Sequence, residues 1–173
     1  MEIESERLIL RDFKESDLED LQEIFGDRET MRFCEPIYSL KQTKEFLQNF
    51  CISGRKAVAV EEKMNGKLLG YLLFKPFYSE QANIFEIGWW INRNYWRKGY
   101  AYEGVTRLIE YAFEQLEVDE IVAETLDNDK SGALVRKLGF DLDKIERTAS
   151  QDNDGNWCDV FWYKLSSQYW KYK

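Results

Sequence analysis

Three apolar segments follow one another closely in the middle of the sequence, at residues 57–60, 68–77 and 84–91. Asn65-Gly66 lies between the first two, and Asn-Gly is the strongest short signal for a β-hairpin because both turn positions tolerate positive φ. Strands joined by such short connections pair as antiparallel neighbours. The sequence therefore predicts a sheet with at least these three strands at its centre.

The segments on either side alternate between strand and helix patterns. Ser16 with Glu19 and Ser39 with Gln42 have capping-box spacing ahead of two short helices, and Gly139 is typical of a helix C-cap. The other predicted elements are strands at 8–10, 121–123, from 140 onward and 157–165, with a turn at 154–155, and helices at 101–116 and 128–138. No repeat or linker interrupts this order, so we expect one α+β domain over residues 1–173.

The composition restricts the chemistry. The chain has no histidine, which excludes serine–histidine and cysteine–histidine nucleophiles and most zinc and non-haem iron sites, so no metal is expected. Its three cysteines, Cys34, Cys51 and Cys158, are widely spaced, as is typical of small buried side chains in a reducing, cytoplasmic location. The N-terminus has no signal-peptide pattern, and no apolar run is long enough to span a membrane.

The most informative stretch runs from Asn94 to Glu103, where a strand leads through a basic loop into a long amphipathic helix. Gly99 and Ala101 allow a ligand to approach the backbone, and the first amides of a helix have no partner within it. Such a helix start binds phosphate groups, and Arg97 and Lys98 add positive charge. The alternative interpretation is a tight turn with a solvated basic pair.

Four motifs in order are similar to those of the GNAT superfamily of N-acetyltransferases, over about residues 5–165. Gly99 and Ala101 fit the last two positions of its Q/R-x-x-G-x-G/A signature. The other three resemble the branch that acetylates the N-termini of ribosomal proteins; they are Ser5-Glu6-Arg7-Leu8-Ile9-Leu10-Arg11, Phe85-Glu86-Ile87-Gly88-Trp89-Trp90-Ile91, and Asn128-Asp129-Lys130-Ser131 followed by Lys137-Leu138-Gly139-Phe140.

This resemblance implies a mixed, mostly antiparallel sheet flanked by helices, and acetyl-CoA as the co-substrate. It implies that the loop and helix start bind the pyrophosphate, that Asn128 binds the pantetheine arm, and that Ser131 donates to the departing thiolate. The implied cofactor-binding residues are Ile91, Arg97, Lys98, Gly99, Tyr100, Ala101, Tyr102 and Asn128. For Asn128 the other interpretation is a helix N-cap, and for Ser131 a small packing residue.

Two positions depart from the family pattern. Trp96 stands where the signature has Gln or Arg, so phosphate binding there depends on backbone amides. Val135 stands where many members have a tyrosine that protonates the thiolate, so this role cannot be transferred.

Glu86 is the candidate proton acceptor. Along the strand 84–91 it shares a face with Gly88 and Trp90, opposite Phe85, Ile87 and Trp89. A carboxylate beside aromatic rings is suited to taking a proton from an amine, whereas the plainer interpretation is an outward-facing surface glutamate. The aromatic residues Trp89, Trp90, Tyr95, Trp96, Tyr100 and Tyr102 are expected around the site, as core or as an acceptor pocket.

The net charge of −8 favours an amine-bearing, cationic acceptor and argues against a nucleic-acid partner, and no membrane partner is expected either. The acceptor itself, whether a protein N-terminus, an aminoglycoside, a polyamine or a small metabolite, stays open, as does the oligomeric state. Two other functions fit parts of the sequence. One is a non-catalytic domain that binds acyl-CoA or a partner. The other is a dinucleotide-binding oxidoreductase, since Gly99-x-Ala101-x-x-Gly104 nearly matches G-x-G-x-x-G and has Glu120 and Glu124 about 20 residues further on.

Overall fold

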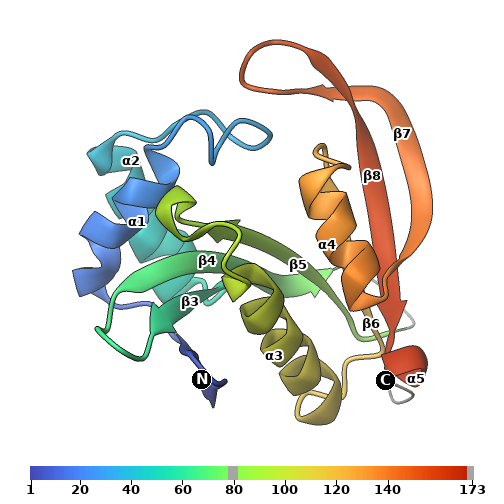
Figure 1. Cartoon of the computed structure of the whole chain (residues 1–173), viewed down its shortest axis with the longest axis horizontal. Coiled ribbons are helices and arrows are strands. Elements are labelled where there is room, and N and C mark those ends of the chain that lie inside the picture. Colours follow the sequence, from blue (N-terminus) through green and yellow to red (C-terminus); the bar gives the residue numbers. More distant parts are fainter. Residues whose placement is uncertain (78–81, 171–173) are drawn as a thin grey trace.

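The fold is built on one eight-stranded sheet, seen in a computed structural model that describes residues 1–77 and 82–170 (Figure 1). The strands lie in the order β1-β2-β3-β4-β5-β6-β8-β7. Every neighbouring pair is antiparallel except β5 and β6, which are parallel. The strands are β1 (Glu2–Glu4), β2 (Leu8–Arg11), β3 (Ala57–Glu62), β4 (Leu68–Phe77), β5 (Ile84–Ile91), β6 (Glu120–Thr125), β7 (Asp141–Gln151) and β8 (Trp157–Ser166). The expected α+β class and the mixed, mostly antiparallel sheet are confirmed.

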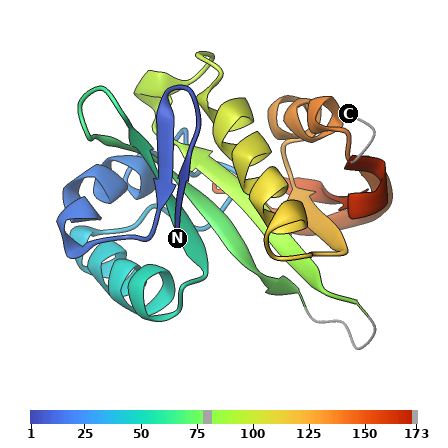
Figure 2. The same ribbon diagram turned by 90° about the horizontal axis from the view of Figure 1, so that it is seen from below.

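Helices cover both faces of the sheet (Figure 2). The long helix α3 (Tyr100–Glu114) and α4 (Lys130–Leu138) pack on one face, and α1 (Leu18–Phe25) and α2 (Leu40–Phe46) pack on the other. Shorter helical segments are η1 (Glu15–Asp17), η2 (Leu47–Ser53), η3 (Arg93–Tyr95) and α5 (Ser167–Trp170). Each face therefore has its own apolar cluster.

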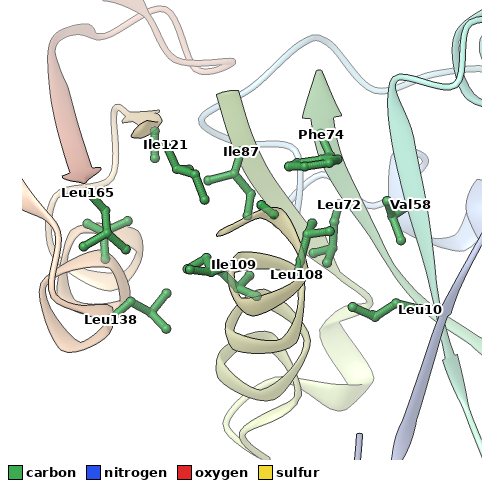
Figure 3. Packing of buried hydrophobic residues seen from close by; sticks show 14 of the residues in the cluster. Leu10, Val58, Leu72, Phe74, Ile87, Leu108, Ile109, Ile121, Leu138 and Leu165 are labelled. Carbon is green, nitrogen blue, oxygen red and sulfur yellow. The ribbon is translucent and has the colours of Figure 1, made fainter. Parts of the chain in front are cut away.

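The larger cluster lies between α3 and the sheet. Leu108 and Ile109 of α3 face Leu72 and Ile87 of the central strands, and all four side chains are essentially inaccessible to solvent (Figure 3). Burial of one such side chain contributes roughly 1.5–3 kcal/mol. This cluster fixes α3, and with it the loop that precedes the helix, against β5.

Several local predictions can be compared with the structure. The capping box at Ser39 is confirmed, with the Ser39 hydroxyl accepting from the Gln42 amide and the Gln42 side chain accepting from the Ser39 amide. The capping box at Ser16 is wrong, because a short 3₁₀ turn precedes α1 and Asp17 is held by Arg11 in a buried ion pair. The strand β1 was not predicted.

The strands β5 and β6 separate soon after they begin to pair. In their parallel register, Ile84 pairs with Glu120, Phe85 with Ile121 and Glu86 with Val122. Beyond those pairs β5 continues to Ile91 and β6 to Thr125, yet no further pairing between them occurs among the described residues. The sheet therefore opens between its two halves.

The hairpin formed by β7 and β8 arches across the top of this opening (Figure 1). Its tip contacts the segment that follows α1. The Asn153 side chain donates to the carbonyl oxygens of Met31 and Glu35. The backbone amide of Asn153 donates to the carbonyl oxygen of Arg32. Asp154 also pairs with Arg28 at 2.6 Å. These contacts fix the hairpin tip to the segment that follows α1.

Candidate active site

The loop between β5 and α3 presents a row of free backbone amides. Arg97 and Gly99 both have left-handed backbones, with φ of 60° and 83°. Within the described part of the chain, none of the amides of residues 97–102 donates a hydrogen bond, and helix bonding begins with the amide of Glu103 to the Gly99 carbonyl. Donors at a helix start, strengthened by the helix dipole, form an anion-binding site.

Arg7 fixes the shape of this loop from the N-terminal side. Its guanidinium donates to the Lys98 carbonyl at 2.9 Å and lies 4.3 Å from the centre of the Tyr100 ring. It also pairs with Glu103 in the first turn of α3 at 2.7 Å. The pairing neutralises a carboxylate that would otherwise repel a phosphate at this helix start. Nothing in the sequence pattern identified Arg7 beyond its place in the N-terminal motif.

Two of the predicted cofactor-binding residues have their polar groups engaged within the protein. The Tyr100 side chain is buried and its hydroxyl donates to Glu62 at 2.6 Å, so that only the backbone of Tyr100 faces the loop. The carbonyl oxygen of Ile91 accepts from the Trp96 indole at 2.6 Å. Trp96 thus ties the loop to the end of β5.

The remaining predicted loop residues are open to solvent. Arg97 and Lys98 are exposed, and the Lys98 ammonium lies 5.0 Å from the centre of the Tyr95 ring. Tyr102 is more than one third exposed and has the Lys137 ammonium of α4 at 4.3 Å from its ring centre. One lysine of the loop and one of α4 thus lie against aromatic rings on either side of the free amides.

Asn128 lies in the loop between the end of β6 and α4. Its side-chain oxygen accepts from the hydroxyl of Tyr163 and from Arg136. Room for this arrangement depends on Gly132, because a Cβ there would lie 2.4 Å from that oxygen. The side-chain amide nitrogen of Asn128 has no acceptor among the described residues, so it can donate to a ligand.

The helix-cap interpretation of Asn128 is wrong. Asp127 performs that function, since its carboxylate accepts from the amides of Asp129 and Lys130. Tyr163, which holds Asn128 from β8, was missed by sequence reasoning, because no motif relates it to Asn128 35 residues earlier.

Ser131 and Val135 lie one turn apart on the same side of α4 but differ in burial. Ser131 is half-buried in the first turn, and its hydroxyl has no partner within the described residues. Val135 is fully buried in the cluster beneath α3. A side chain at position 135 therefore packs in the core, whereas Ser131 keeps a free donor near Asn128.

Glu86 lies on the opposite face of the sheet from α3. It is 8% exposed and forms an ion pair of 2.6 Å with Lys75, its cross-strand neighbour on β4. The Trp90 ring lies against Gly88, since a Cβ on Gly88 would come within 2.9 Å of it. The predicted alternation of faces is confirmed, and the surface interpretation of Glu86 is wrong.

A cysteine also lies on the Glu86 face of the sheet, in contact with Trp90. The Trp90 indole donates to the sulfur of Cys34, which comes from the segment beneath the hairpin tip. Burial raises the pKa of the Cys34 thiol to about 11, even though the Trp90 bond opposes this, so the thiol stays protonated near neutral pH. Cys51 is buried as expected, whereas Cys34 and Cys158 are partly exposed, so that the expectation of three buried cysteines is wrong for two of them.

The aromatic residues expected around the site divide between the two faces. Tyr100 belongs to the cluster under α3, with Trp89 and Tyr95 packed against it, while Trp90 packs against the cluster formed with α1 and α2. The predicted site residues therefore form two groups. The free amides, Asn128 and Ser131 belong to the α3–α4 side of the sheet, and Glu86 lies on the other side.

The described residues contain no group of side chains arranged to hold a metal ion. None of their helices is long and apolar enough to cross a membrane.

The comparisons with known proteins agree with this geometry. Residues 7–141 match the model of the acetyltransferase (GNAT) domain family. The uncharacterized N-acetyltransferase YnaD of Bacillus subtilis is 25% identical over 173 residues, which cover 98% of this chain and 99% of YnaD. A GNAT-family acetyltransferase from Bacillus anthracis superposes with a TM-score of 0.87, at 25% identity and over 97% of this chain and 99% of that one.

The fold is also that of RimL, an α-N-protein acetyltransferase of a ribosomal protein solved in complex with coenzyme A. The TM-score is 0.81 and the identity 19%, over 96% of this chain and 98% of RimL. An acetyltransferase domain that matches across both helix α3 and the opening between β5 and β6 excludes the dinucleotide-binding alternative. The chain therefore belongs to the GNAT family and is an N-acetyltransferase.

Proposed function

We propose that this enzyme moves the acetyl group of acetyl-CoA to a primary amine by direct attack in a ternary complex. The observation that carries the proposal is the row of free amides at residues 97–102, next to the opening between β5 and β6. The amides and the α3 dipole would hold the pyrophosphate. The pantetheine arm would enter the opening and receive a hydrogen bond from the side-chain nitrogen of Asn128.

The chemistry requires two proton movements. A protonated amine first loses one proton to a base on the Glu86 face of the sheet, and its nitrogen then attacks the thioester carbonyl carbon. Collapse of the tetrahedral intermediate breaks the carbon–sulfur bond, and the second proton goes to the thiolate, with Ser131 as the proposed donor. The products are an amide and CoA, with one proton released to solvent.

Holding the two substrates in attacking geometry supplies a large part of the acceleration, so that little covalent machinery is needed. Glu86 is the base proposed from the strand motif. The protein also binds the acceptor from the side opposite the cofactor, because the Glu86 face and the α3 face are separated by the sheet.

The acceptor is proposed to be cationic. The net charge of −8 and the carboxylates on the Glu86 face both favour a protonated amine. RimL, whose fold is shared, is named for acetylating the α-amine of a protein, and this supports a protein N-terminus as one candidate.

The test is CoA release with a panel of amines: peptides with free N-termini, polyamines, aminoglycosides and amino acids. We expect amine-dependent thiol release with one class, together with a gain of about 42 Da per acetyl group in the product. Binding of acetyl-CoA without amine-dependent release from any class would favour the non-catalytic alternative, and failure to bind acetyl-CoA would overturn the proposal.

A further inference from the structure

Glu86 is poorly placed to accept a proton by itself. Its carboxylate is paired with the Lys75 ammonium at 2.6 Å, and its side chain is only 10% exposed. Protonation of Glu86 would leave the Lys75 charge partly buried without its partner, and solvent has little access for carrying the proton away. A second carboxylate on the same face meets neither difficulty.

That carboxylate is Glu124, on β6 beyond the point where β5 and β6 separate. Val122 is the last residue of β6 paired with β5, opposite Glu86. Because strand side chains alternate, Val122 and Glu124 share a face, and it is the face of Glu86, since Ile121 and Ala123 belong to the cluster under α3. Glu124 is thus the first residue on that face beyond the last pair, two positions along β6 from the neighbour of Glu86.

Glu124 is exposed and has no ion-pair partner among the described residues. Its cross-strand neighbour on β8 is Trp162. The negative charge of Glu124 also contributes to the raised pKa of the Cys34 thiol. It thus borders the opening on the acceptor side, with a route for a proton to solvent.

The charges around Glu124 favour its protonated form. Partial removal from water raises its pKa first, and the nearby carboxylate of Glu86 raises it further. Lys75 opposes this, while Glu146 on β7 and Glu35 after α1 add to the rise. Lys144 partly offsets Glu146 by an ion pair of 2.6 Å. A carboxylate in this setting is a stronger base than one in water.

We propose that Glu124 is the group that takes the proton from the acceptor ammonium, and that the ion pair of Glu86 with Lys75 positions the acceptor beside it. The inference rests on the proposed acetyl transfer and refines its first step. The amine gives one proton to the Glu124 carboxylate, which releases it to solvent, and the neutral nitrogen then attacks the thioester. The later transfer of the second proton to the thiolate is unchanged.

The test compares turnover–pH profiles of Glu124→Gln and Glu86→Gln, with whichever amine gives turnover in the wild type. Glu124→Gln is nearly isosteric, and we expect kcat to fall about 10²–10⁴-fold with loss of the acidic limb of the profile. Acetyl-CoA affinity, measured by calorimetry, should be unchanged. Glu124→Asp should retain part of the turnover and keep an acidic limb.

Glu86→Gln should behave differently, because it removes a negative charge that raises the pKa of Glu124. We expect its acidic limb to persist and to move to lower pH. Glu120→Gln is the matched control, since it makes the same change on the same strand and face at the paired end, and it should leave the profile unchanged.

The opposite pattern would overturn the inference. If Glu86→Gln loses the acidic limb while Glu124→Gln keeps both limb and turnover, Glu86 is the base. Near-full turnover in both variants would assign proton removal to water. A wild type that binds acetyl-CoA but releases no CoA with any amine would instead count against the proposed function itself.

Discussion

Arg7 and Glu103 form an ion pair of 2.7 Å that joins the residue before β2 to the first turn of α3. The backbone amide of Arg7 donates to the same carboxylate at 2.8 Å, and the Ser5 hydroxyl does so at 2.7 Å. Residues separated by 96 positions thus hold the helix start whose amides face the proposed pyrophosphate site. The contact connects the N-terminal motif with cofactor binding.

Replacing Arg7 by Met should therefore weaken acetyl-CoA binding. The variant leaves Glu103 unneutralised beside the phosphates and frees the Lys98 carbonyl. We expect the dissociation constant, measured by calorimetry, to rise about tenfold, equivalent to about 1.4 kcal/mol. Arg107→Met is the control, because Arg107 has similar exposure and also pairs with a glutamate of α3, Glu110, away from the loop. Equal losses in the two variants would contradict a specific function for Arg7.

The same carboxylate should make stability depend on pH. Although burial acts against it, the hydrogen bonds from Ser5 and Arg7 lower the pKa of Glu103 below its ordinary value of 4.5. The unfolded chain therefore binds more protons at this site, and the stabilisation is present above about pH 4.5 and lost as pH falls through the lower, folded value. The difference in unfolding free energy between wild type and Glu103→Gln should shrink from pH 7 to pH 3 in urea titrations. A constant difference would contradict this.

Gly99→Val should separate cofactor binding from folding. A valine at a φ of 83° is strained, and its side chain would stand beside the free amides. We expect at least a tenfold rise in the acetyl-CoA dissociation constant. Gly66→Val places the same residue at a φ of 72° in the β3–β4 turn, where nothing lies within 4 Å. Both variants should lose similar stability, about 1–3 kcal/mol, but only the first should lose binding.

Gly132→Ala should act through Asn128. The new Cβ would lie 2.4 Å from the Asn128 side-chain oxygen and 3.0 Å from Arg136, so the Asn128 side chain must move. Alanine favours helix by about 1 kcal/mol over glycine, and we therefore expect acetyl-CoA binding to weaken more than stability. In an Asn128→Ala background the same change should have little further effect on binding, as in a double-mutant cycle. Additive losses would show that Gly132 acts by another route.

The apparent affinity of the acceptor should depend on salt. A cationic amine attracted by Glu35, Glu86 and Glu124 would bind more weakly at 300 mM than at 50 mM salt, because ions screen such attraction. The measurement is the KM of the acceptor, with the KM of an uncharged amine analogue as the reference. Equal salt dependence for both would remove the electrostatic argument.

Local signals in the sequence were sufficient for most of the fold. The Asn65-Gly66 turn, the Gly139 cap and the strand 84–91 appear where periodicity and turn chemistry predict them. The Ser16 capping box failed because Arg11 takes Asp17 into a buried ion pair, a contact that sequence spacing cannot reveal. At this helix start, the ion pair between Arg11 and Asp17 outweighed the capping preference of the sequence.

The candidate site was predictable only where it is continuous in sequence. The loop 97–102 was identified because its residues are adjacent. Tyr163, Arg7 and Glu124 were not selected for the site, since each reaches it through strand pairing or a contact between distant segments. The Lys75 partner of Glu86 follows from the β4–β5 register, which the sequence does not specify to the residue.

The short pairing of β5 with β6 has a mechanical consequence. Among the described residues, β5 and β6 are joined by three residue pairs, so few backbone contacts link the two halves of the sheet at this junction. A pantetheine arm with its two amide groups could bridge the separated strands as a substitute strand, and the empty protein would lack that bridge. Amide hydrogen exchange along residues 87–91 and 123–125 would then slow on loading with coenzyme A. The bound cofactor would in that case be part of the sheet for as long as it stays bound.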